Sequence, residues 1–117
     1  MHELAVTEGI LKVVLDAAAQ AGARQIRAID LVIGELSGMV DDSIQFYFDI
    51  LSRDTPAAGA TLRFHREPAT VTCLECGDEF AGQLPLTPFC PRCGSVRLRV
   101  AGGRELRVES IEIEERT

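Results

Sequence analysis

The sequence has few lysines and few aromatic residues, and its acidic residues outnumber its basic ones. Lys12 is its single lysine, tryptophan is absent and one tyrosine is present. The formal net charge is −6 at pH 7, with 18 acidic residues against 12 basic ones. A protein that binds nucleic acid needs a basic face for the phosphates or aromatic side chains on which bases stack. The composition therefore argues against nucleic-acid binding.

The sequence also lacks the motifs that indicate an enzyme. No glycine-rich phosphate-binding loop follows a predicted strand. The sequence has just two histidines, and neither belongs to a recognisable Ser-His-Asp set. The acidic residues at positions 105, 109, 112, 114 and 115 are interpreted as the solvated face of a strand. We therefore expect no catalytic activity of its own.

Long apolar stretches are missing as well. No window approaches the roughly 18 apolar residues of a membrane-spanning helix. A secretory signal would need an uninterrupted apolar segment within residues 1–20. Four charged residues interrupt this region, namely Glu3, Glu8, Lys12 and Asp16. We expect a cytoplasmic protein without a membrane partner, in a compartment where thiols stay reduced.

The cysteines are the strongest signal that the sequence does contain. All four lie in two matched pairs, Cys73-x-x-Cys76 and Cys90-x-x-Cys93. Each pair places two sulfurs on one tight turn, and two such turns supply the four corners of a tetrahedral metal site. The pattern predicts a structural Zn(II) ion held in a zinc ribbon.

Glycine follows each pair, at Gly77 and Gly94, where a positive φ lets backbone N–H groups face the sulfurs. Iron is the alternative ion, because C-x-x-C-G with C-P-x-C-G is also the pattern of a rubredoxin-type site. Two disulfides are disfavoured in a reducing compartment.

Periodicity predicts two helices and three strands outside the cysteine segment. Polar residues recur every fourth position from Glu8 to Gln20, which predicts a helix over about 3–21 that ends at Gly22. A second helix should begin at Asp41 or Asp42, either of which can cap it, and run to about residue 53. Alternating segments predict strands at 25–33, 60–67 and 105–114. The apolar face expected for the first helix comprises Leu4, Leu11, Val14, Leu15 and Ala18.

The order of these elements predicts the fold. Strand, helix and strand over residues 25–67 form a minimal βαβ unit with parallel strands. In the last strand the apolar residues occupy even positions before Glu109 and Ser110 and odd positions after them. This change indicates a bulge, or a strand that pairs in two different sheets. We predict an α+β fold, a three-stranded mixed sheet with two helices and an inserted zinc-ribbon domain. The main domain would comprise residues 1–68 and 102–117, and the insert residues 69–101.

The two histidines differ in what they can do. His65 lies on the polar face of a predicted strand and is interpreted as a surface residue. His2 directly follows Met1, which carries the free amine. One metal ion can therefore bind three nitrogen donors in adjoining chelate rings: the Met1 amine, the His2 amide nitrogen and the His2 imidazole. Deprotonated amide nitrogen suits square-planar ions, nickel(II) and copper(II) above all. Glu3 could add its amide nitrogen or its carboxylate, and the alternative is a frayed terminus that binds nothing.

Three features together resemble the HypA/HybF family, the nickel metallochaperones of nickel–iron hydrogenase maturation. These are Met1-His2-Glu3 ahead of a helix, residues 33–38 (IGELSG) and the two cysteine pairs. The resemblance covers essentially the whole chain. It implies a site for Ni(II) as transient cargo at Met1, His2 and Glu3, and structural zinc at Cys73, Cys76, Cys90 and Cys93.

The resemblance also implies partners, namely the accessory GTPase of hydrogenase maturation and the hydrogenase large subunit. Asp41 falls where some family members carry an acid proposed to influence nickel, and it is a weaker candidate. Histidines in the zinc segment of certain relatives have no counterpart here, so a fourth nickel ligand would be a backbone nitrogen, a carboxylate, water or a partner group. The alternatives are a zinc-ribbon nucleic-acid-binding module and a rubredoxin-like iron electron carrier.

Overall fold

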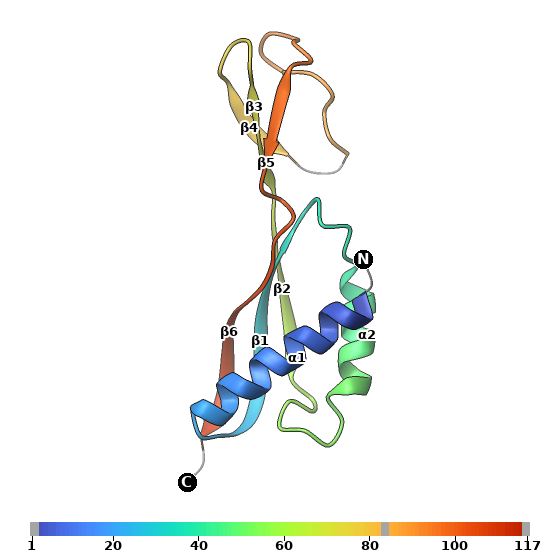
Figure 1. Cartoon of the computed structure of the whole chain (residues 1–117), viewed down its shortest axis with the longest axis vertical. Helices are drawn as coiled ribbons and strands as arrows, with labels where there is room; N and C mark the ends of the chain where they lie inside the picture. Colours follow the sequence, from blue (N-terminus) through green and yellow to red (C-terminus); the bar gives the residue numbers. More distant parts are fainter. Residues whose placement is uncertain (1–2, 83–84, 116–117) are drawn as a thin grey trace. The chain divides into compact units, whose positions relative to one another are not determined.

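The computed structural model describes residues 3–82 and 85–115. The chain forms two compact units, which we call the first unit (Met1–Val32, Met39–His65 and Arg107–Thr117) and the second unit (Ile33–Gly38 and Arg66–Leu106). Figure 1 shows the elements in chain order: α1 (Glu3–Gln20), β1 (Ala23–Gly34), α2 (Asp41–Leu51), β2 (Thr61–Glu67), β3 (Ala69–Cys73), β4 (Glu79–Gly82), β5 (Leu98–Ala101) and β6 (Leu106–Glu115).

The sheet of the first unit has the strand order β2-β1-β6. Figure 1 shows β1 and β2 running in the same direction and β6 in the opposite one, so the sheet is mixed. Because α2 connects β1 to β2, this arrangement confirms the predicted strand-helix-strand unit with parallel strands. Neither α1 nor α2 has the length and apolarity that a helix needs to cross a membrane.

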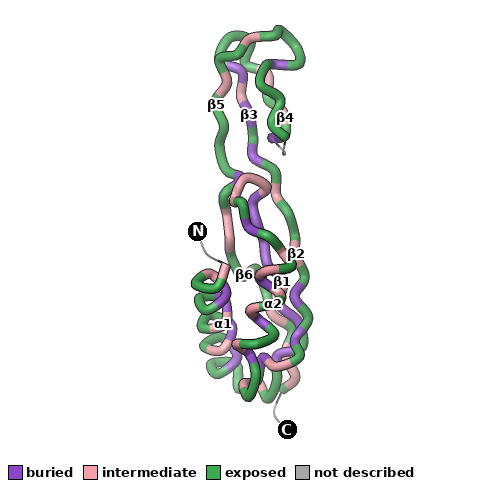
Figure 2. Tube along the Cα trace, turned by 90° about the vertical axis from the view of Figure 1, so that its right-hand side faces the viewer, coloured by how far each residue is buried: buried purple, intermediate pink, exposed green. Residues whose placement is uncertain are grey.

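The core of the first unit forms around the central strand β1, whose residues are mostly buried (Figure 2). Ile26, Ile29 and Leu31 are 0% exposed, and Ile44 and Phe48 of α2 are equally buried. Each such side chain contributes roughly 1.5–3 kcal/mol when it leaves water. The first half of β1 alternates between exposed and buried residues, whereas its second half is almost continuously buried. This difference explains why the second half of the strand is almost continuously apolar.

The buried stripe of α1 differs from the predicted one. It comprises residues spaced by three or four positions, Thr7, Ile10, Val14 and Ala18. Leu4 is 42% exposed, and Leu11 and Leu15 are half-buried, so these three residues border the core instead of forming it. The polar Thr7 is tolerated inside because its hydroxyl donates a hydrogen bond to the carbonyl oxygen of Glu3, at 2.6 Å.

The start of α2 also corrects a prediction. The N-cap residue is Val40, whose backbone is extended, and its own side chain makes no capping hydrogen bond. Asp41 and Asp42 lie inside the first turn, where their negative charge interacts favourably with the positive end of the helix dipole. The prediction that one of these aspartates caps the helix is therefore wrong by one position.

The second unit contains an antiparallel sheet with the order β4-β3-β5. The sequence predicted a short hairpin in this segment, and β5 was not predicted. Thr70 pairs with Ala81 on one side and Ala101 on the other, so β3 is the central strand. Cys73, the last residue of β3, is placed at the end of this sheet.

The segment Ile33–Gly38 lies in the second unit, whereas the sequence placed it in the main domain. Backbone hydrogen bonds explain the difference: Gly34 N–H donates to Glu105 O at 2.7 Å, and Leu36 N–H donates to Gly103 O at 2.6 Å. A Cβ atom on Gly34 would lie 2.1 Å from the carbonyl carbon of Gly103, so only glycine allows this approach. The predicted limits of the insert, 69 and 101, omit this contribution from a distant part of the chain.

Candidate metal centres

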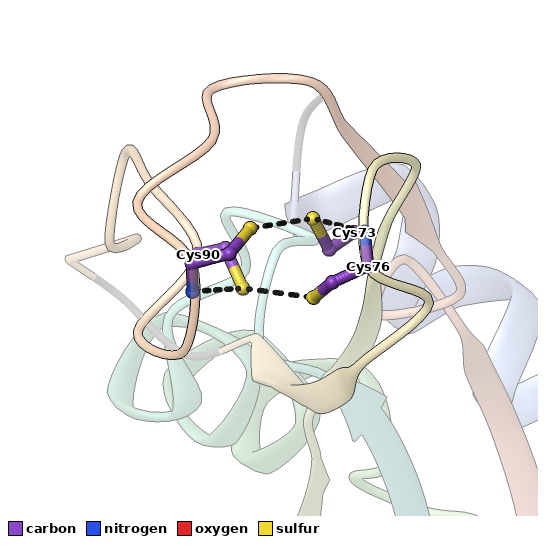
Figure 3. Close-up of side chains that lie close together, drawn as sticks. Cys73, Cys76 and Cys90 are labelled. Atoms are coloured by element: carbon purple, nitrogen blue, oxygen red, sulfur yellow. Dashed lines mark hydrogen bonds between the residues drawn. The ribbon is translucent and has the colours of Figure 1, made fainter.

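The four cysteines form a cluster in the second unit. Their Sγ atoms all lie within 4.8 Å of one another, and it is the one such group of metal-ligating side chains among residues 3–82 and 85–115. Figure 3 shows Cys73 and Cys76 on one turn facing Cys90 on the other. The sequence prediction that the two pairs come together is confirmed.

The spacing of the sulfur atoms fits a tetrahedral ion site. The Sγ atoms of Cys73 and Cys93 are 3.5 Å apart, and those of Cys76 and Cys90 are 3.7 Å apart. Four thiolates at about 2.3 Å from one zinc ion lie about 3.8 Å from each other. These separations are also far longer than a disulfide bond of about 2.05 Å, and all four residues are free thiols.

Both turns have the backbone geometry expected of metal-binding knuckles. Gly77 and Gly94 have φ values of 79° and 77°, and their N–H groups donate to the carbonyl oxygens of Cys73 and Cys90 at 2.9 and 2.8 Å. The N–H groups of Cys76 and Cys93 point at the sulfur atoms of Cys73 and Cys90, both at 3.5 Å. Such N–H groups stabilise negative charge on sulfur, which a thiolate ligand requires.

The thiols differ in exposure and acidity. Cys73 and Cys90 are each 1% exposed, whereas Cys76 and Cys93 are exposed. Hydrogen bonding from the Cys76 N–H lowers the pKa of Cys73 to about 6. The Ser95 N–H lowers the pKa of Cys93, but the hydrogen bond with the neighbouring Cys73 sulfur outweighs it, and the pKa is raised to about 12. One thiolate therefore forms readily, and a divalent ion would displace the protons from the others.

The predicted nickel ligands are partly outside the described residues, since these begin at Glu3 and leave out Met1 and His2. Glu3 is the first residue of α1. Its Oε2 atom accepts a hydrogen bond from the N–H of Val40 at 3.3 Å, across 37 positions of sequence. Because Val40 directly precedes Asp41, this bond brings the backbone beside Asp41 to Glu3. Sequence reasoning missed Val40, since no local pattern signals a contact between these two segments.

His65 lies on the surface of the first unit, with 55% of its side chain exposed, as the sequence predicted. Its Nε2 atom is 2.9 Å from Asp30 Oδ1. Arg63 donates two hydrogen bonds to the same carboxylate at 2.9 and 3.0 Å, and Ser110 donates one at 2.9 Å. His65 is thus one member of a polar network that joins β2, β1 and β6, and Asp30 is its central acceptor.

Replacement of Asp30 by asparagine should lower the melting temperature at neutral pH. Hydrogen bonds from Arg63, then from His65 and Ser110, hold the pKa of Asp30 well below its usual range. A carboxylate with a lowered folded-state pKa stabilises the fold above its unfolded pKa of about 4, and this contribution is lost as the pH falls further. The difference in melting temperature from the native protein should therefore shrink below about pH 4. An Asp42→Asn control should show a smaller difference, and a pH-independent difference for Asp30→Asn would contradict the assignment.

A comparison with known protein families gives a match over nearly the whole chain. Residues 1–113 match the family described as "Hydrogenase/urease nickel incorporation, metallochaperone, hypA". The chain belongs to the HypA family. The family resemblance inferred from the sequence is thereby confirmed.

Several HypA relatives align with nearly the whole chain. A hydrogenase maturation factor HypA of Dehalococcoides mccartyi is 47% identical over 116 residues, which cover 98% of this chain and 96% of the relative. That of Geobacter metallireducens is 40% identical over 114 residues, which cover 97% of this chain and all of the relative. The solution structure of the Ni metallochaperone HypA from Helicobacter pylori matches with a TM-score of 0.67 and 23% identity, covering 99% of this chain and 100% of that one. This last likeness supports the fold.

Proposed function

We propose that this HypA-family chain is a cytoplasmic nickel metallochaperone, which binds Ni(II) at Met1, His2 and Glu3 and delivers it during hydrogenase maturation. The observation that carries the proposal is a match to a nickel-incorporation family that begins at residue 1. The amine, an imidazole and adjoining amide nitrogens supply the nitrogen ligands that square-planar nickel(II) prefers. A site at the end of a chain is open to a recipient, which suits an ion that is passed on.

The four cysteines have a different role in this proposal. Cys73, Cys76, Cys90 and Cys93 would hold Zn(II) with four thiolates, which leaves no open position for substrate. Zinc would therefore stabilise the second unit without taking part in chemistry. The separations of 3.5 and 3.7 Å between sulfur atoms support this ligand set. The protein would act by binding and transferring an ion, without catalytic turnover.

The exposed surface of α1 offers a place for a partner. A groove of about 360 Å³ lies between α1 and α2, with Leu11, Leu15 and Leu51 in its wall. Glu8, Lys12 and Asp16 also line it, so acidic residues outnumber the single basic one. We propose that the accessory GTPase of the maturation pathway docks here with apolar side chains flanked by basic ones. Docking on α1 would bring the GTPase to the helix that begins with Glu3, and the hydrogenase large subunit would then receive the nickel.

A charge placed in this groove should weaken GTPase binding. Leu11→Glu puts a carboxylate among the leucines, and its desolvation on docking should weaken the dissociation constant about tenfold or more. Leu11 is half-buried at the edge of the core, so the variant should keep its helix content. The measurement is surface plasmon resonance with the purified GTPase, alongside circular dichroism.

The matched control is Val96→Glu, which adds the same charge to the second unit at a residue that is 76% exposed. This control should bind the GTPase like the native protein. If Leu11→Glu bound normally while Val96→Glu failed to bind, the docking surface would belong to the second unit.

A further inference from the structure

The strand β5 of the second unit has one free edge. It pairs with the central strand β3 on one side, and in the described part of the chain no strand pairs with it on the other. Its backbone forms no further hydrogen bond among the described residues. Figure 2 shows β5 exposed along most of its length at the side of the sheet. Every second residue of β5 therefore turns an unpaired N–H and C=O outward, where a further strand can pair.

One face of this sheet is apolar, and its apolar surface continues to the free edge. Residues that pair directly across an antiparallel sheet have their side chains on the same face. Val71 pairs with Phe80 on one side and with Val100 on the other, so these three residues share a face. Val71 is 2% exposed at the centre of the sheet, whereas Val100 is 45% exposed at the edge. An apolar side chain placed beside β5 would therefore cover Val100.

The opposite face has an arginine without a charged partner at the same edge. Thr72 of β3 pairs with Arg99 of β5 on one side and with Glu79 of β4 on the other, so the two edges of the sheet carry opposite charges. Within the described residues no carboxylate forms an ion pair with Arg99, whereas the neighbouring Arg97 is paired with Glu75 at 2.8 Å. The free edge of β5 thus presents an uncompensated positive charge in a chain whose net charge is −6.

These features fit an extended segment in which acidic and apolar residues alternate. Successive residues of a strand point to opposite faces, so one side chain would cover Val100 while the next one meets Arg99. A second copy of β5 fits poorly, because it would bring a second Arg99 to the same edge. Like charges on neighbouring strands destabilise their pairing.

We propose that the free edge of β5 binds an extended acidic segment of a partner protein by strand addition, and that Arg99 and Val100 determine which segment binds. In this mode of recognition, main-chain hydrogen bonds supply affinity and alternate side chains supply specificity. The inference goes beyond the proposed nickel function. It assigns a partner surface to the second unit, whereas the groove proposed for the GTPase belongs to the first unit.

The test uses a short fluorescein-labelled peptide of alternating valine and glutamate, with fluorescence anisotropy as the measurement. Arg99→Ala should bind this peptide about threefold more weakly than the native protein, the size expected for loss of one exposed ion pair. Arg99→Glu should bind it about tenfold more weakly or worse, because attraction becomes repulsion. The Arg99→Glu variant should instead bind a peptide of alternating valine and lysine better than the native protein does. Arg92→Ala is the matched control, since it removes an exposed arginine that lies outside β5, and it should bind like the native protein.

A modified peptide separates strand addition from simple charge attraction. Methylation of its backbone nitrogens keeps every side chain but removes the N–H donors, so binding to the native protein should weaken about tenfold or more. This comparison needs no variant, so it holds even if a substitution affects folding. Equal binding of the methylated and unmodified peptides, or native affinity in Arg99→Glu, would overturn the proposal. Dimers of the native protein that the peptide dissociates would assign the edge to a second copy and would also overturn it.

Discussion

Replacement of Cys73 by serine should abolish zinc binding and unfold the second unit while leaving most of the helix signal. Cys73 is 1% exposed and is the last residue of the central strand β3, so the variant leaves an incomplete ligand set at the end of a small sheet. Structural zinc contributes on the order of 10 kcal/mol in small metal-binding domains, more than three short strands supply by themselves. Both helices belong to the first unit, whose core contains Ile44 and Phe48.

Metal analysis and circular dichroism measure the two parts of this expectation. The native protein should contain one zinc per chain without iron, and the Cys73→Ser variant should contain none. Val96→Ala is the matched control, because Val96 lies two residues after Gly94 and is 76% exposed. Native zinc content in the serine variant, or loss of the helical spectrum together with the zinc, would contradict a separately stabilised second unit. Purified protein that contained iron and was coloured would favour the electron-carrier alternative.

One residue added ahead of Met1 should eliminate nickel binding at the terminus. The extension converts the Met1 amine into an amide and moves the free amine away from His2, so the adjoining chelate rings no longer form. Isothermal titration should show no nickel uptake at concentrations that saturate the native chain, with zinc content and helix signal unchanged. The same residue added after Thr117 is the control, and His65→Ala should also bind normally.

The same site should weaken as the pH falls. The amine, the imidazole and each amide ligand must release a proton before they bind nickel. Affinity should therefore decline steadily below about pH 6.5, where the imidazole is protonated as well. Nickel affinity that stayed constant from neutral pH to about pH 5 would exclude these nitrogens as ligands.

Much of the fold follows from local patterns in the sequence. Alternation and helical spacing located both helices and the three strands of the main sheet within a few residues of their observed ends. The predictions were wrong where contacts between distant segments determine which residues are buried. The core-facing stripe of α1 includes Thr7 and Ile10. The Thr7 hydroxyl is satisfied by the carbonyl oxygen of Glu3, so Thr7 can be buried although a hydropathy pattern does not indicate it.

The candidate sites likewise have one part that the sequence predicts and another that it does not. The four-cysteine cluster was predictable because the spacing of the cysteines itself encodes two equivalent turns, and the glycines after each pair have the positive φ that the turns require. The contact from Glu3 to Val40 and the contribution of Ile33–Gly38 to the second unit were not predictable. The first is a hydrogen bond from a backbone N–H to a side-chain carboxylate, and the second consists of backbone hydrogen bonds. Both join segments that are distant in the chain, and sequence patterns give no signal of such contacts.

The most direct test of nickel handling is a titration of the zinc-loaded protein with an unmodified N-terminus against His2→Ala. The native chain should bind one nickel ion per chain and keep its zinc. The His2→Ala variant should keep its zinc and take up no nickel at the same concentrations. Equal nickel uptake by both proteins, or uptake in the native chain that released an equal amount of zinc, would show that nickel is bound elsewhere and would contradict the account.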